Sequence, residues 1–300
     1  MIRFSKSLLL MLLVFGFASA CEKDNLDADR VVPQSVIDKL ADMGFNPDGI
    51  RHMDDGYLIE GDILITQEFL NSENTEHRVP TMEQYSTNNL VSTGGSRNIT
   101  VYIDAADNTA NSTTSGGNDK ARGGKPGGGG GGGSSFSAEY GAALNDAIGR
   151  FNAENLEITF ERVGSSSGAD IVFTRLKKGD ERQGILGSAG FPTSAGNPYG
   201  AIKMSGIIQS TYGWSTDAIA TVMAHEMGHC IGMRHTDYFD RSISCGGGTA
   251  NEGDGGVGAN HIPDTPTGAT QSAGSWMLSC TGGGDRQFNN DDKAALDYLY

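Results

Sequence analysis

The stretch ATVMAHEMGHCIGMRHTD, residues 220–237, contains three of the six histidines of this 300-residue chain. His225 and His229 are four positions apart, which on a helix places both side chains on one face, one turn apart. Apolar residues recur at helical spacing through residues 215–231. Gly232 predicts the end of this helix, because glycine adopts the left-handed conformation without steric cost. The chain can then turn and bring His235 back to the other two histidines.

Three converging imidazoles predict a Zn²⁺ site, and the open fourth position is typical of a catalytic rather than a structural ion. Glu226 projects beside the metal and is suited to act as general base on a water. One alternative is a chance match of surface histidines. Another is a structural zinc, but such a site needs a fourth Cys or His at ligand spacing, and Cys230 points about 100° around the helix from His229. Nothing in the sequence establishes a structural calcium.

The rest of the chain predicts an α+β fold, a mixed twisted sheet with helices packed on it. The active-site helix is one of these, and residues 289–300 predict another at the C-terminus. Alternating or apolar runs predict strands at 98–104, 156–163, 169–175, 185–192 and 199–208, and helical periodicity marks 36–43 and 138–151. Residues 105–135 are rich in glycine and predict an inserted loop.

The motif HEMGHCIGMRH resembles the long zinc signature of the metzincin metallopeptidases. GSWMLSC resembles their methionine turn, which implies that Met277 forms an apolar floor under the metal. A closer resemblance, to the bacterial dual-action HEIGH metallopeptidases, rests on HEMGHCIGMRHTDYFDRS, NEGDGGVGANHIPDTPTG, SWMLSC and FNNDDKAALDYLY. It spans about residues 98–300. Ser279 stands where some metzincins carry a tyrosine ligand, so no tyrosine ligand is expected.

The resemblance implies a zinc-dependent metalloendopeptidase, with His225, His229 and His235 as metal ligands, a metal-activated water and Glu226 as base. A protein or peptide substrate would lie along an edge strand, for which residues 187–192 are the candidate, and a specificity pocket would be walled by residues 262–279. Two alternatives stay open. One is a zinc hydrolase of cell-wall peptides, and the other is a non-catalytic surface binding lipoprotein of the same fold.

Residues 1–20 predict a signal peptide, because a basic start precedes an apolar run too short to span a bilayer. The following Cys21 resembles the lipidated cysteine of bacterial lipoproteins, and the alternative is a secreted protein cut near Ala20. We therefore expect an exported protein, lipid-anchored at the outer membrane or surface of a Gram-negative bacterium, or secreted after processing. The net charge of −15 argues against nucleic acid and anionic lipid surfaces as partners. We expect contact with a membrane only through the lipid anchor. We also expect the protein to be a monomer.

Residues 21–97 are interpreted as a tether, a small prosegment-like region and a polar linker, ahead of a peptidase domain at 98–300. The stretch LIEGDI, 58–63, resembles the prosegment motif of astacin-like zymogens, which implies that Asp62 takes the open metal position in a latent chain. The alternative is a plain Gly-Asp turn between two strands. Cys245 and Cys280 bracket the loop before the methionine turn and are the expected disulfide, which leaves Cys230 as a buried thiol.

Overall fold

The computed structural model describes residues 31–71, 84–107, 135–253, 256–266, 268–270 and 274–300. The predicted signal peptide, the lipidation site Cys21 and most of the glycine-rich loop lie outside these residues. Residues 32–300 form one compact unit. We call residues 32–71 the N-terminal segment. Within the described part of the chain, no helix combines the length and apolarity needed to cross a membrane.

A five-stranded mixed sheet forms the centre of this unit, in the order β6-β5-β7-β9-β8. Its strands are β5 (Arg97–Ile103), β6 (Ile158–Arg162), β7 (Ile171–Arg175), β8 (Gly187–Ser188) and β9 (Ala201–Met204). All neighbours are parallel except β8, which pairs antiparallel with β9 at the edge. The predicted edge strand is therefore confirmed at Gly187 and Ser188, but it is only two residues long.

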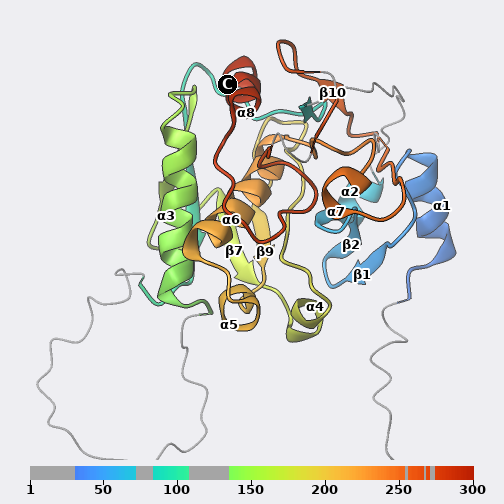
Figure 1. Cartoon of the computed structure of the whole chain (residues 1–300), viewed down its shortest axis with the longest axis horizontal. Helices are drawn as coiled ribbons and strands as arrows, with labels where there is room; N and C mark the ends of the chain where they lie inside the picture. Colours follow the sequence, from blue (N-terminus) through green and yellow to red (C-terminus); the bar gives the residue numbers. More distant parts are fainter. Residues whose placement is uncertain (1–30, 72–83, 108–134, 254–255, 267, 271–273) are drawn as a thin grey trace, which may run out of the picture. The chain divides into compact units, whose positions relative to one another are not determined.

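Helices α3 (Ala138–Asn152) and α6 (Thr216–Ile231) pack against each other, as Figure 1 shows. Together with α8 (Asn290–Leu299) they bury one large apolar cluster against the sheet, with Phe151, Trp276 and Met277 among its members. The α+β class is confirmed. Short helices α4 (Lys178–Arg182), α5 (Ile208–Tyr212) and α7 (Ser242–Cys245) lie in stretches without a helical period long enough to predict them.

The N-terminal segment folds as α1 (Gln34–Asp42), a three-stranded antiparallel sheet and α2 (Gln67–Asn71). The strands are β1 (Arg51–Met53), β2 (Gly56–Ile59) and β3 (Ile63–Thr66). The turn between β2 and β3 is Glu60-Gly61-Asp62, where both Glu60 and Gly61 have positive φ. Gly61 therefore lies in a turn between two strands, in a conformation that glycine adopts without steric cost. Apolar residues of the segment bury one another, and Phe191 and Val257 pack with them.

Part of the predicted linker is packed structure instead. Strand β4 (Tyr85–Ser86) pairs antiparallel with β10 (Asn260–His261). Tyr85 is fully buried, and its carbonyl accepts a hydrogen bond from the backbone N–H of Arg234 in the histidine motif. The linker interpretation is wrong for these residues. Tyr85 is a single aromatic residue in a polar stretch, so it produces no sequence periodicity, although its tertiary contacts are extensive.

Candidate metal centre and active site

Helix α6 carries the first two histidines on one face, as its spacing predicts. Ser215 caps its first turn by accepting a hydrogen bond from Ala218 N, and Gly232 ends it in the left-handed conformation. A side chain at Gly232 would also stand 2.9 Å from the carbonyl of Asn89, so glycine is needed there for two reasons. The turn returns His235 to the helix, so that all three rings lie together and are buried.

The three Nε2 atoms converge on one point. His225 Nε2 lies 3.1 Å from that of His229 and 3.2 Å from that of His235. The Nδ1 atoms point away, to the carbonyl of Trp276 from His225, to that of Met233 from His229, and to the carboxylate of Glu252 from His235. Since each Nδ1 faces an acceptor, the single proton of a neutral ring belongs on Nδ1, which leaves Nε2 able to bind a cation.

Three bare lone pairs at such distances repel one another unless a cation lies between them. Tetrahedral ligands bonded to Zn²⁺ at about 2.0–2.1 Å are separated by roughly 3.3 Å, which is close to the observed spacing. The residues therefore fit a metal ion, with His225, His229 and His235 as its holders. Asp62, His225, His229 and His235 form one group whose ligand atoms all lie within 4.8 Å of one another.

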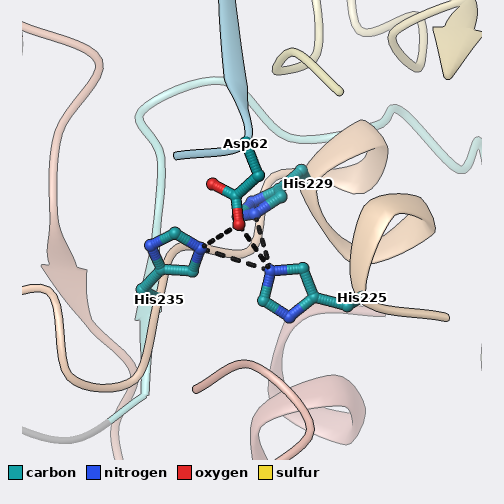
Figure 2. A group of neighbouring side chains, drawn as sticks. All are labelled: Asp62, His225, His229 and His235. Carbon is teal, nitrogen blue, oxygen red and sulfur yellow. Dashed lines mark hydrogen bonds and ion pairs between the residues drawn. The ribbon is translucent and has the colours of Figure 1, made fainter. Parts of the chain in front are cut away.

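Asp62 enters this group from the β2–β3 turn, with its carboxylate directed at the three rings in Figure 2. Its Oδ2 lies 3.1 Å from His235 Nε2 and 3.4 Å from His225 Nε2. The backbone places it there through β8: Ala189 N donates to the carbonyl of Asp62, and Leu64 N donates to the carbonyl of Ala189. The N-terminal segment thus covers the free edge of the central sheet beside the histidines.

The electrostatics favour positive charge at the centre of the group. Burial raises the pKa of Asp62, but the neighbouring His235 and His225 outweigh it and the net shift is downward. Burial lowers the pKa of His235, but the carboxylates of Asp62 and Glu252 reverse this and raise it well above its usual range. Burial and the other two histidines lower the pKa of His229. The same carboxylates, of Asp62 and Glu252, would stabilise a cation bound between the three rings.

Glu226 is buried next to the histidines and beside the edge strand. A Cβ at Gly187 of β8 would lie 2.3 Å from Glu226 Oε1, so the strand approaches the carboxylate as closely as a glycine allows. Glu226 Oε2 has no hydrogen-bond partner among the described residues. Burial, and after it the charge of Asp62, raises the pKa of Glu226. One carboxylate oxygen is thus buried without a hydrogen-bond partner among the described residues.

Trp276 and Met277 pack against helix α6 next to the histidines. Trp276 supplies the carbonyl that orients His225, and both side chains are fully buried. A Cβ at Gly228, inside the HEMGH sequence, would lie 2.5 Å from the Trp276 ring and 2.7 Å from Met277 Sδ. The floor therefore packs directly on the helix backbone at Gly228.

A pocket of about 350 Å³ opens beside Glu226. Val222 and His225 of α6 line it, with Leu186 ahead of β8 and the segment 279–282 opposite. Of the described residues in the range 262–279 predicted for a specificity pocket, only Ser279 lines it. The reason is that Ser279 N and Cys280 N bond Asp237 and Ser244, which turns the residues after Met277 toward the pocket.

A buried charge network lies behind His235 and was not foreseen from the sequence. Arg234, fully buried, places Nη2 3.1 Å from the carboxylate of Glu60 and 3.9 Å from that of Glu252. Glu252 also lies 3.0 Å from Arg241. Burial raises the pKa of Glu60 well above its usual range although Arg234 opposes the rise, whereas His235 and both arginines hold the pKa of Glu252 below its usual range against the effect of burial. Glu60 and Glu252 sit in stretches without periodicity, so no local signal identifies them.

Cys245 and Cys280 form a disulfide, and Cys230 is a buried free thiol. The disulfide ties the loop after His235 to the segment that follows the methionine floor. Cys21 lies outside the described residues.

Buried histidines arranged around a common point, with a glutamate beside them and a pocket next to it, define a metallopeptidase. Residues 128–300 match the family described as dual-action HEIGH metallo-peptidase, which is more than half of the chain. The chain belongs to this family. Comparison with curated proteins finds no match.

Proposed function

We propose that the protein is a zinc metalloendopeptidase of the metzincin type. The observation that carries this proposal is the convergence of three bare Nε2 lone pairs beside Glu226, at the mouth of a pocket and next to a sheet edge. When bound there, Zn²⁺ supplies a Lewis acid that polarises the scissile carbonyl and lowers the pKa of the attacking water.

The residues of the chain supply the remaining chemistry. Glu226 accepts the proton of the attacking water on its carboxylate and delivers it to the leaving amine. The carbonyl of Trp276 and the carboxylate of Glu252 hold His225 and His235 in the tautomers that keep Nε2 free. Backbone groups of β8 and Ala189 align the peptide once that edge is uncovered.

We further propose that the N-terminal segment keeps the full chain latent. Two features support this: Asp62 Oδ2 lies 3.1 Å from His235 Nε2 and 3.4 Å from His225 Nε2, and residues 62–64 lie along the sheet edge that a substrate would need. Release would follow cleavage after the segment, for which Arg78 is the candidate, outside the described residues. Arg97 is a poor candidate because it begins β5 and donates to the carbonyl of Gly196 at 2.7 Å.

The test is casein hydrolysis by the full wild-type chain and by Asp62→Ala, each with and without a chelator, together with the zinc content of both. We expect about one zinc per chain and chelator-sensitive hydrolysis that is strong in Asp62→Ala. A zinc-loaded protein in which neither chain cleaves casein or any peptide would favour the non-catalytic binding lipoprotein. Hydrolysis of cell-wall peptides in place of casein would favour the other alternative.

Export is proposed on the N-terminal sequence alone. A signal peptide over residues 1–20 and a lipid on Cys21 would anchor the peptidase to a membrane surface. Mass spectrometry of the mature N-terminus, in the wild type and in Cys21→Ser, tests this. A lipid-free wild-type N-terminus at Cys21 or later would leave an ordinary secreted protein.

A further inference from the structure

We infer that Arg234 is a carboxylate-binding subsite of the substrate cleft, filled by Glu60 in the full chain and by a carboxylate of the substrate once the N-terminal segment has left. This inference rests on the proposed hydrolysis and latency. It adds a class of preferred substrate: peptides that present a carboxylate close to the scissile bond.

Glu60 and Arg234 each lie close in sequence to a member of the metal-binding group. Glu60 is two residues before Asp62, in the same turn, and Arg234 directly precedes the ligand His235. The two side chains meet at 3.1 and 3.2 Å, so both carboxylate oxygens reach Nη2. The turn between β2 and β3 therefore directs two carboxyl groups inward, one toward the metal-binding atoms and one toward Arg234.

The second step is that Arg234 is held in place without Glu60. Its Nη2 donates to the carbonyl of Gly253 at 3.0 Å and its Nη1 to that of Gly258 at 3.3 Å. Its guanidinium also lies 5.7 Å from the ring centroids of Phe191 and Tyr238. Two carbonyls and two rings fix the orientation of the guanidinium, so removal of Glu60 uncovers a preorganised donor.

The third step is the charge balance of the network. With Glu60 present, two arginines, Arg234 and Arg241, share two carboxylates, those of Glu60 and Glu252. Departure of the segment removes the carboxyl group of Glu60 from Arg234, and a buried guanidinium favours another acceptor of the same shape in that place. The ligand that matches the geometry is again a carboxylate, because that is what the site already holds.

Two sources of a substrate carboxylate share this chemistry: an Asp or Glu side chain, and the free C-terminus of a short peptide. Peptides with an internal acidic residue and an amidated end test the side-chain source. Neutral peptides with a free C-terminus test the other.

The binding arm of the test needs no activity. In the full Glu60→Ala chain, acetate should raise the Tm in a concentration-dependent way, since it binds the folded state beside Arg234, and neutral acetamide of the same shape should not. Glu154→Ala is the matched control, because it removes the carboxylate of another ion pair, with Lys293, outside this network. An equal response to acetate and acetamide in Glu60→Ala, or an equal acetate response in Glu154→Ala, would overturn the inference.

The specificity arm uses the full Glu60→Ala/Asp62→Ala chain, in which both inserted carboxylates are removed. We expect kcat/KM to be roughly tenfold higher for carboxylate-bearing peptides than for neutral amidated ones, the worth of one charged hydrogen bond. Asp62→Ala alone should show a smaller preference, because Glu60 still competes. Equal cleavage of all peptides by the double variant would overturn the subsite. Acetate binding without cleavage of any peptide would instead refute the proposed hydrolysis while keeping the anion site. If Glu60→Ala does not fold, Glu60→Gln, which keeps the shape, replaces it in the peptide assay.

Discussion

Oδ2 of Asp62 lies 3.1 Å from Nε2 of His235, although 173 residues separate them in the chain. The carboxylate is where the fourth ligand of a metal held by the three histidines would be, and a ligand there excludes the attacking water. We therefore predict that Asp62→Ala releases latency in the unprocessed chain. A short-peptide assay should show a nearly inactive wild type and a clearly active variant.

The matched control for this prediction is Asp55→Ala. It breaks the 2.7 Å ion pair between the same segment and Lys203 of β9 but leaves Asp62 untouched. We expect it to stay latent, because a single exposed ion pair adds little to docking. A wild-type full chain as active as one cleaved between residues 72 and 83 would contradict latency. A truncation at Asn98 is unsuitable as the comparison, because it would remove the buried Tyr85.

Glu226 is the residue whose loss should separate metal binding from catalysis. In the Asp62→Ala background, Glu226→Gln should keep the zinc content near one per chain, since the glutamine is not among the metal holders. Activity should fall by about 10²–10⁴, the usual contribution of a positioned general base. Atomic absorption and peptide hydrolysis measure the two effects. Undiminished turnover by the glutamine variant would refute the role of Glu226.

Gly228 offers a test of the floor under the metal. Gly228→Ala would push a methyl group into Trp276 and Met277, which lie 2.5 and 2.7 Å from the new Cβ. Overpacking of this kind costs about 1–3 kcal/mol of unfolding free energy. It should also weaken zinc binding, because Trp276 orients His225. Gly149→Ala on α3 is the control, since nothing lies within 4 Å of its Cβ and helix propensity favours alanine by up to about 1 kcal/mol. Equal unfolding free energies for Gly228→Ala and Gly149→Ala would show that Trp276 and Met277 can move to accommodate the methyl group.

The disulfide should contribute to stability through the loop that it closes. Cys245 and Cys280 are 35 residues apart, so the chain-entropy relation gives about 3–4 kcal/mol. We expect Cys245→Ser/Cys280→Ser to unfold at lower denaturant concentration and to become insensitive to dithiothreitol. Cys230→Ala should keep the sensitivity of the wild type. If reductant leaves the wild-type midpoint unchanged, the disulfide contributes nothing.

The parts of the site that depend on spacing within one helix could be predicted from the sequence. The α6 histidines, Glu226 and Gly232 are set by spacing along one helix, so local periodicity is sufficient to place them. The resemblance to a known signature added Met277, which packs under the site from a stretch with no period of its own. Asp62 lies beside the histidines, as the resemblance of its turn to a prosegment motif implies, and its role as a latency ligand stays a prediction.

The charge network and the short strands could not be foreseen. Arg234 meets Glu60 across 174 residues, and nothing local to either residue identifies its partner. Strands β4 and β10 have two residues each, which is too few for an alternation to be recognised. These elements are determined by tertiary packing, on which single-sequence patterns carry no information.

The last prediction concerns Asp292, which links the C-terminal helix to the floor of the site. Its buried carboxylate accepts hydrogen bonds from Ser275 Oγ and Gln84 Nε2, each at 2.6 Å, and from Trp276 N at 3.4 Å. Burial nevertheless raises the pKa of Asp292 to about 6, whereas the unfolded chain has about 3.9. As the pH falls from about 7 to about 4, the folded state binds this proton first, so the contribution of Asp292 to stability rises, by about 3 kcal/mol in all. Asp292→Asn cannot titrate and lacks this rise. Urea unfolding of chelator-treated wild type and Asp292→Asn across that pH range measures it, because the other groups cancel in the difference. We expect the wild type to gain on the variant as the pH falls, and a constant or shrinking difference would show that the carboxylate is ionised in the folded protein down to its unfolded pKa.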